Sequence, residues 1–172
     1  MDLVAMEIVS IYSIPVIATW TPTPGFLVWR LSMKWRAAVD RAVAPFGLTH
    51  AQYSVLASLY GMVRAGERPS QRRLADHTGL EAIYISKLVR ALETAGLVER
   101  AADPADTRAV RLALTTAGSD VAQRAIAVVR DLQEELTAPL GGLRGRRTRN
   151  LVRELEMLLA APRPPGKTGE DQ

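Results

Sequence analysis

Basic and polar side chains gather in one short segment of this 172-residue chain, and their chemistry suits the binding of anions. Residues 68–90 contain five basic residues against only two acidic ones, Asp76 and Glu81. Arginine and lysine donate charge-assisted hydrogen bonds to phosphate oxygens, and they also reach the acceptor atoms on the edge of guanine. The composition of this segment therefore favours contact with a nucleic acid.

Catalysis needs arrangements of residues that the chain does not offer. The sequence has no nucleophile–base–acid triad, paired-carboxylate site, phosphate-binding loop or HExxH motif. It has no cysteine for a disulfide or a zinc–thiolate site, and its two histidines, His50 and His77, are too few for a histidine-rich metal site. We therefore predict no enzyme activity, no catalytic residue, no metal site and no cofactor.

Two helices joined by a tight turn must position the basic residues. Ser70 is suited to cap a short helix that ends near Thr78, and Gly79 permits the turn because glycine adopts positive φ without steric cost. A second helix is predicted over residues 83–94, and Gly96 is placed to end it. Four apolar residues share the inward face of this second helix: Ile85, Leu88, Val89 and Leu92.

A β-hairpin is predicted after these helices. Residues 97–100 and 109–114 have the apolar alternation of two strands with one buried face, and residues 102–108 form a polar tip between them. Helix, turn, helix and hairpin in this order predict a winged helix-turn-helix, a fold that places its second helix in the major groove of duplex DNA.

The outward side of the second helix is predicted to read base edges. Five residues lie on that side: Ala82, Tyr84, Ser86 and Lys87, which we expect in the major groove, and Arg90, which we expect to hold a phosphate. Lys87 can reach guanine or a phosphate, Ser86 can bond to either, and Tyr84 can touch a thymine methyl group or a phosphate. A solvated helix surface is the alternative interpretation, and it would explain Lys87 or Arg90 taken alone.

Further DNA contacts are predicted from the preceding helix and from the hairpin. Gln71, Arg72 and Arg73 open the preceding helix, where amides and arginines bind the DNA backbone. Arg108 lies in the polar tip of the hairpin, from which an arginine can enter a narrow minor groove. The alternatives are an exposed basic turn for the first group and a polar turn with a weak surface ion pair for the second.

Helical patterns flank this module, so the chain is predicted to be mainly α-helical with one small β-hairpin. A helix is expected over residues 26–44, and Thr49 and Gln52 form a capping box at the start of the next one. The inward face predicted for that next helix consists of Val55, Leu56, Leu59 and Met62. After the hairpin, Thr115 or Thr116 begins a long helix, and a final helix follows. The apolar stripes of these last two helices are Val121, Ala125, Val128, Leu132 and Leu136, and then Leu151, Leu155 and Leu158.

Composition and the two ends of the chain bound the class of protein. Hydrophobic residues make up 48% and charged residues 23%, as in an ordinary globular protein, and the net charge of +4 allows nucleic-acid binding without requiring it. Residues 1–24 read as an apolar extension and a stiff linker, with neither the basic start of a signal peptide nor an uninterrupted membrane span. Residues 161–172 read as a disordered tail. We expect a cytoplasmic protein without a membrane partner, and membrane attachment through residues 1–20 is the alternative.

Three runs of sequence resemble the MarR family of transcriptional regulators. They are LTHAQYSVLASL, then LADHTGLEAIYISKLVRALETAGLVER, then DPADTRAVRLALTTAG, and the likeness covers residues 26–160. The resemblance implies a winged helix-turn-helix over about residues 48–115 and dimerisation helices over about residues 25–45 and 116–160. It further implies a homodimer that binds a pseudo-palindromic operator in double-stranded DNA as a ligand-responsive repressor.

The same resemblance implies a pocket for a small aromatic or phenolic ligand, which by position Trp35, His50 and Tyr53 would line. The chain departs from the family pattern at Glu81, where a Ser- or Asp-type cap is more frequent, and at Ala105, where many members carry a basic residue. Both departures weaken the DNA-facing surface. They keep open a second interpretation, a winged-helix protein-interaction module with weak or no DNA binding.

Overall fold

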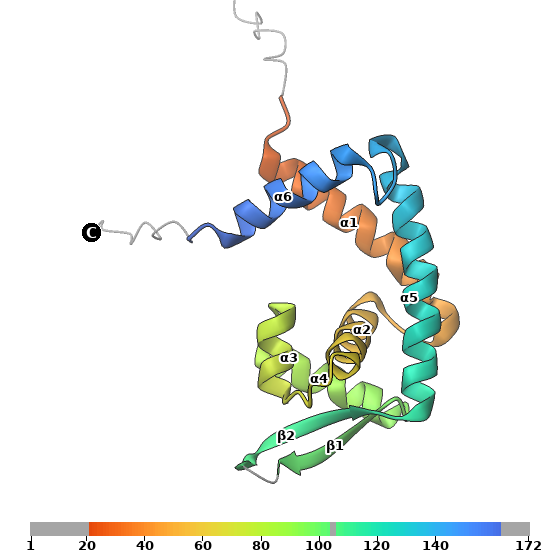
Figure 1. Ribbon diagram of the computed structural model, residues 1–172, viewed down its shortest axis with the longest axis vertical. Coiled ribbons are helices and arrows are strands. Elements are labelled where there is room, and N and C mark those ends of the chain that lie inside the picture. The colour runs from red at the N-terminus through yellow and green to blue at the C-terminus, as the bar shows by residue number, and fades with distance from the viewer. Residues whose placement is uncertain (1–20, 104–105, 163–172) are drawn as a thin grey trace, which may run out of the picture. The chain divides into compact units, whose positions relative to one another are not determined.

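The fold is known from a computed structural model, which describes the backbone of residues 21–103 and 106–162 and the side chains of these residues outside 101–110 (Figure 1). The predictions for residues 1–20 and 163–172 lie outside the described residues. The chain divides into two units between Trp35 and Arg36, within helix α1. Among the described residues, none of the helices combines the length and the apolar character that crossing a membrane requires.

The elements are mostly helical, as expected, with one antiparallel pair of strands. In chain order they are α1 (Pro24–Val43), η1 (Ala44–Phe46), α2 (His50–Arg64), α3 (Gln71–Thr78), α4 (Ala82–Thr94), β1 (Val98–Asp103), β2 (Asp106–Leu114), α5 (Thr116–Thr137), η2 (Ala138–Leu140) and α6 (Arg146–Ala160). Helix α1 begins two residues before the predicted start, at Pro24, because proline suits the first turn of a helix, where no N–H donor is needed.

Helix α2 lies at the centre of the unit that follows Trp35. It contacts α3, α4, α5 and β2, and its side chains Val55, Leu56 and Leu59 are fully buried. The predicted capping box starts it, because Gln52 N donates to Thr49 Oγ1 at 3.3 Å and Thr49 N donates to Gln52 Oε1 at 2.8 Å. The residues that α2 and α4 bury in the core are those predicted for their inward faces.

Hydrogen bonds at the end of α4 set the direction of the hairpin. Leu97 N donates to Leu92 O at 2.9 Å, and Gly96, with φ of +70°, donates to Glu93 O at 2.9 Å. These two bonds form a Schellman motif, and Gly96 ends α4 as the sequence predicts. The outer edge of β2 is fastened by a bond from Leu112 N to Pro69 O at 2.9 Å, so the hairpin is attached to the residues just before α3.

Two predictions about these elements are wrong in detail. The strands continue to Asp103 and resume at Asp106, so Ala102, Asp103 and Arg108 belong to strands rather than to a loop at the tip. Backbone pairing needs no apolar side chains, and it therefore extends through this polar stretch.

The second correction concerns α5. Its buried hydrophobic residues are Ala122, Ala125 and Val129, of which only Ala125 belongs to the predicted stripe, and Val128 from that stripe is 39% exposed. Small residues on α5 let its backbone approach α2 closely, and this contact decides which face of the helix is turned inward.

Candidate nucleic-acid interface

The first turn of α3 presents two arginines to solvent. Ser70 caps this eight-residue helix by accepting a hydrogen bond from Arg73 N at 3.1 Å. Arg72 and Arg73 are exposed and Gln71 is half-buried. Arg73 Nε lies 3.3 Å from Glu67 Oε2, whereas Arg72 has no acidic partner within the described part of the chain. At the start of α3, the guanidinium of Arg73 is therefore in an ion pair, and that of Arg72 is not paired with a described acidic residue.

A tight turn connects α3 to α4. Gly79 has φ of +68° and donates to Ala75 O at 2.9 Å, which ends α3 where the sequence predicts. Glu81 is the N-cap residue of α4, but its side chain makes no capping hydrogen bond. Burial of Leu74 on α3 and of Ile85 on α4 packs the two helices together. Because it makes no capping bond, the Glu81 carboxylate can turn outward from the start of α4.

The outer face of α4 carries the residues of this helix that are predicted to contact DNA. Ala82, Tyr84, Lys87 and Arg90 are exposed, and Ser86 is half-buried. The structure confirms that these residues lie away from the core, although their contact with DNA stays a prediction.

The residues predicted to read bases do not include the most exposed large hydrophobic side chain of α4. It is Ile83, of which 73% is exposed. A helical turn of 3.6 residues places it in one row with Lys87 and Arg90, and this spacing was the signal that could have revealed it.

The hairpin projects beyond the group formed by α2, α3 and α4 (Figure 1). An ion pair supports its base, because Arg100 Nε on β1 donates to Glu93 Oε2 on α4 at 2.6 Å. The backbone of Arg108 lies in β2, and its side chain is outside the described residues. A minor-groove contact by Arg108 therefore stays a prediction.

Two of the three residues predicted to line a ligand pocket lie at the start of α2. His50 N donates to Asp40 Oδ1 at 2.6 Å, and Tyr53 is half-buried. Burial raises the pKa of the Tyr53 phenol above its ordinary value, so the hydroxyl is a neutral donor at pH 7. Trp35 belongs to the other unit, and the three residues together as a pocket stay a prediction.

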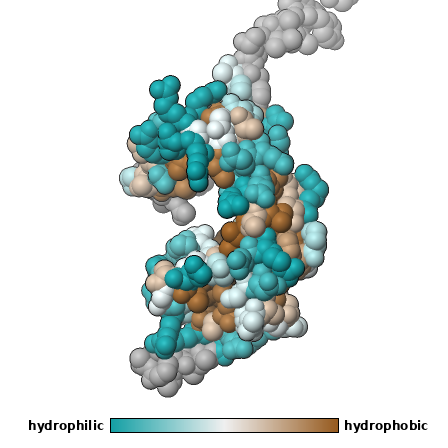
Figure 2. Space-filling view, turned by 45° about the vertical axis from the view of Figure 1, so that its right-hand side comes forward, coloured by the Kyte–Doolittle hydropathy of each residue, from teal (hydrophilic) through white to brown (hydrophobic). Residues whose placement is uncertain are grey.

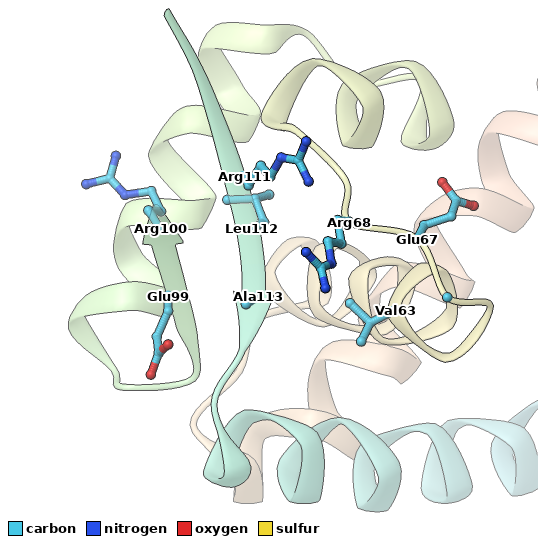
Figure 3. Close-up of a pocket in the computed structure, with 9 residues that line it drawn as sticks. Val63, Glu67, Arg68, Glu99, Arg100, Arg111, Leu112 and Ala113 are labelled. Carbon is cyan, nitrogen blue, oxygen red and sulfur yellow. The ribbon is translucent and has the colours of Figure 1, made fainter. Parts of the chain in front are cut away.

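A cavity of about 480 Å³ lies elsewhere, between the end of α2, the loop before α3 and the hairpin (Figure 3). Val63, Leu112 and Ala113 supply apolar walls, and the Arg68 side chain is directed between Val63 and β2. Trp35, His50 and Tyr53 do not line this cavity.

Comparison with known proteins shows where this architecture recurs. A profile described as "MarR family" matches residues 46–109. A Bacillus subtilis protein named "Uncharacterized HTH-type transcriptional regulator YdcH" is 35% identical over 116 residues, which cover 67% of this chain and 79% of that protein. The "HTH-type transcriptional repressor Rv2887" of Mycobacterium tuberculosis is 30% identical over 131 residues, covering 76% of this chain and 91% of the repressor.

A solved structure agrees with these relatives. The M. tuberculosis transcriptional regulator MOSR in complex with DNA superposes with a TM-score of 0.64 at 28% identity, over 80% of this chain and 96% of MOSR. The relatives are named as transcriptional regulators or repressors, not as enzymes. The identities, the shared coverage and the winged helix-turn-helix geometry show that this chain belongs to the MarR family.

Proposed function

We propose that this protein is a transcriptional regulator that binds double-stranded DNA as a homodimer and represses its target genes. One observation carries the proposal: the outer face of α4 presents Lys87 and Arg90 to solvent. Lysine and arginine at such positions suit guanine acceptors and phosphates. Relatives named as repressors, and a DNA complex among the similar structures, support the same function.

Residue roles follow from position within the winged helix-turn-helix. We place Ala82, Tyr84, Ser86 and Lys87 on α4 in the major groove. Phosphate contacts fall to Gln71, Arg72, Arg73 and Arg90. Arg108 on the hairpin would supply the wing contact in the minor groove. The DNA-binding module would then occupy about residues 48–115.

A second copy of the chain is the partner that we infer for the helices outside this module. Helix α6 exposes Met157, Leu158 and Leu159, and the first half of α1 exposes Leu27 and Trp29. The face seen in Figure 2 shows hydrophobic (brown) areas among hydrophilic (teal) ones. Soluble monomers rarely expose contiguous apolar patches, and a closed dimer would cover them. Dimerisation would present two α4 helices to the two halves of a pseudo-palindromic operator.

Relief of repression by a small aromatic or phenolic ligand is the regulatory part of the proposal. The neutral hydroxyl of Tyr53 can donate a hydrogen bond to a polar atom of such a ligand, and His50 lies one helical turn before it. A ligand that binds better to one spacing of the two α4 helices would shift the dimer away from the DNA-competent state.

A gel-shift titration of the full-length protein with random genomic fragments, repeated at increasing salt, tests DNA binding. Phosphate contacts make the affinity fall steeply as salt rises, and selection of the bound fragments would yield the operator. If no fragment is retained even at low salt, DNA binding is excluded. The interpretation as a protein-interaction module would then replace it.

A further inference from the structure

An exposed aliphatic residue stands in the middle of the proposed base-reading face. Ile83 is 73% exposed, compared with 42% for Tyr84, its neighbour on α4. At about 100° per residue, Ile83, Lys87 and Arg90 fall within a sector of about 60° around the helix axis. The buried residues Ile85 and Val89 lie on the opposite side. Ile83 therefore points away from the core as directly as the two cations do.

Its place along the helix matters as much as its direction. Ile83 is the second residue of α4, and a recognition helix contacts base edges mainly through its N-terminal residues. An aliphatic side chain can form no hydrogen bond with a base edge. The feature of the major groove that matches it is the C5 methyl group of thymine.

The charges beside Ile83 indicate what kind of surface covers it. Lys87 and Arg90 lie in the same row and are exposed, and neither has an acidic partner in residues 21–103 and 106–162. An apolar protein surface would have to desolvate these two cations. A DNA groove offers a methyl group for Ile83 and phosphates or guanine for the cations at the same time.

We propose that Ile83 is a specificity-determining residue that reads thymine in each half-site by contact with its C5 methyl group. This inference rests on the proposed function. From the sequence alone, Tyr84 could touch a thymine methyl group, and we assign that contact to Ile83 instead. Tyr84 lies about 100° away around the helix, where its hydroxyl suits a phosphate.

Replacement of thymine by deoxyuridine tests the contact, because it removes the methyl group and leaves the hydrogen-bonding edge unchanged. With the operator obtained by selection, each thymine is replaced in turn and the Kd of the full-length protein is measured by fluorescence anisotropy. At one symmetry-related thymine per half-site, we expect the replacement to raise the Kd of the wild-type protein about three- to fivefold. This is the change in affinity expected from the loss of one buried methyl group.

Ile83→Ala should bind the unmodified operator several-fold more weakly and should no longer distinguish thymine from deoxyuridine at that position. Its salt dependence should equal that of the wild type, because an apolar contact releases no counterions. Val63→Ala removes a different exposed aliphatic side chain, on α2, and should keep the full discrimination. Ile83→Val, which shortens the side chain by one methylene group, should keep part of it.

The possible outcomes separate the methyl contact from DNA binding as such. If the wild type and Ile83→Ala respond alike to deoxyuridine at every position, the methyl contact is wrong while DNA binding stands. If no deoxyuridine replacement weakens binding by the wild-type protein, the methyl contact is likewise wrong. If the wild type retains no duplex at any salt concentration, both the proposed function and this inference fail.

Discussion

Arg72 and Arg73 are adjacent in the first turn of α3, but their guanidinium groups are in different states. Arg73 is paired with Glu67 across 3.3 Å, and both side chains are partly exposed. Such a surface pair is worth about 0–1 kcal/mol, so a phosphate could replace Glu67 at small cost. Arg72 has no pair to break within the described residues. The two arginines should therefore contribute differently to DNA binding.

Arg72→Ala should weaken binding to specific and random duplex alike, because a phosphate contact carries no sequence information. The slope of log K against log salt should fall in magnitude by about 1, as expected when one phosphate is no longer neutralised. Arg73→Ala is the matched comparison, and we expect a smaller change because its guanidinium must first leave Glu67. Gel-shift titrations at several salt concentrations measure both slopes. An unchanged slope for Arg72→Ala would exclude this contact.

The raised pKa of Tyr53 predicts that the folding stability falls at alkaline pH. Its raised pKa means that the unfolded chain, with the ordinary value of about 10, loses this proton before the folded chain does. The contribution of Tyr53 to stability is thus fully present below about pH 10 and is lost as the pH rises through the folded pKa. Urea unfolding across this range should show a shallower decline for Tyr53→Phe than for the wild type. Equal declines would mean that Tyr53 is not the group responsible.

At the scale of elements, the start of α5 packs closely against Gly96 and Leu97, the two residues that precede the hairpin. Thr115 Oγ1 donates to Gly96 O at 2.7 Å and accepts from Gly118 N at 2.9 Å. A Cβ atom added to Gly118 would lie 1.8 Å from Leu97 O, which is backbone and cannot turn aside. The start of α5 can approach the end of α4 only because residue 118 has no side chain.

Gly118→Ala should therefore destabilise the protein by about 1–3 kcal/mol, as expected when atoms are forced into a packed site. Gly61→Ala is the control, since Gly61 lies within α2 and a Cβ there meets no atom within 4 Å. Alanine favours helix over glycine, so this control should be neutral or more stable by up to about 1 kcal/mol. Thermal unfolding of both variants measures the difference. Equal stability of the two would contradict the close approach.

At the scale of the whole molecule, α6 is stable only if something covers its apolar residues. Leu158 is 65% exposed and Leu159 is 86% exposed in the single chain. Isolated helices of this length are marginal in water, and most helical stability comes from packing of an apolar face. A second copy of the chain supplies that packing in the proposed dimer.

Leu158→Glu should shift the protein towards monomers, because it would bury an unpaired charge in each subunit at the proposed interface. Operator affinity should fall by more than about tenfold as the two α4 helices are separated. Val63→Glu places the same charge on an exposed position of α2 and should stay dimeric. Sedimentation equilibrium decides the oligomeric state. A dimeric Leu158→Glu variant would place the interface elsewhere.

Local patterns in the sequence were enough for the helix-turn-helix itself. Thr49, Ser70 and Gly79 act within a few residues of their own positions, so capping and turn rules identified the boundaries of α2 and α3. Periodicity identified the buried faces of α2 and α4 for the same reason, since each face is a repeat along one helix. Thr49 and Gly79 also lie in the runs of sequence that carry the family likeness.

Features that depend on partners far along the chain were decided only by tertiary structure. The buried face of α5 follows from its contact with α2, and the pairing of Arg73 with Glu67 follows from the path of the loop before α3. The exposure of Ile83 likewise depends on which neighbours cover α4. By itself the sequence determined the order, caps and inward faces of the helices, because these arise from interactions over a few residues. Tertiary structure decided which charges are paired and which apolar residues remain for a partner, because both depend on how distant segments pack.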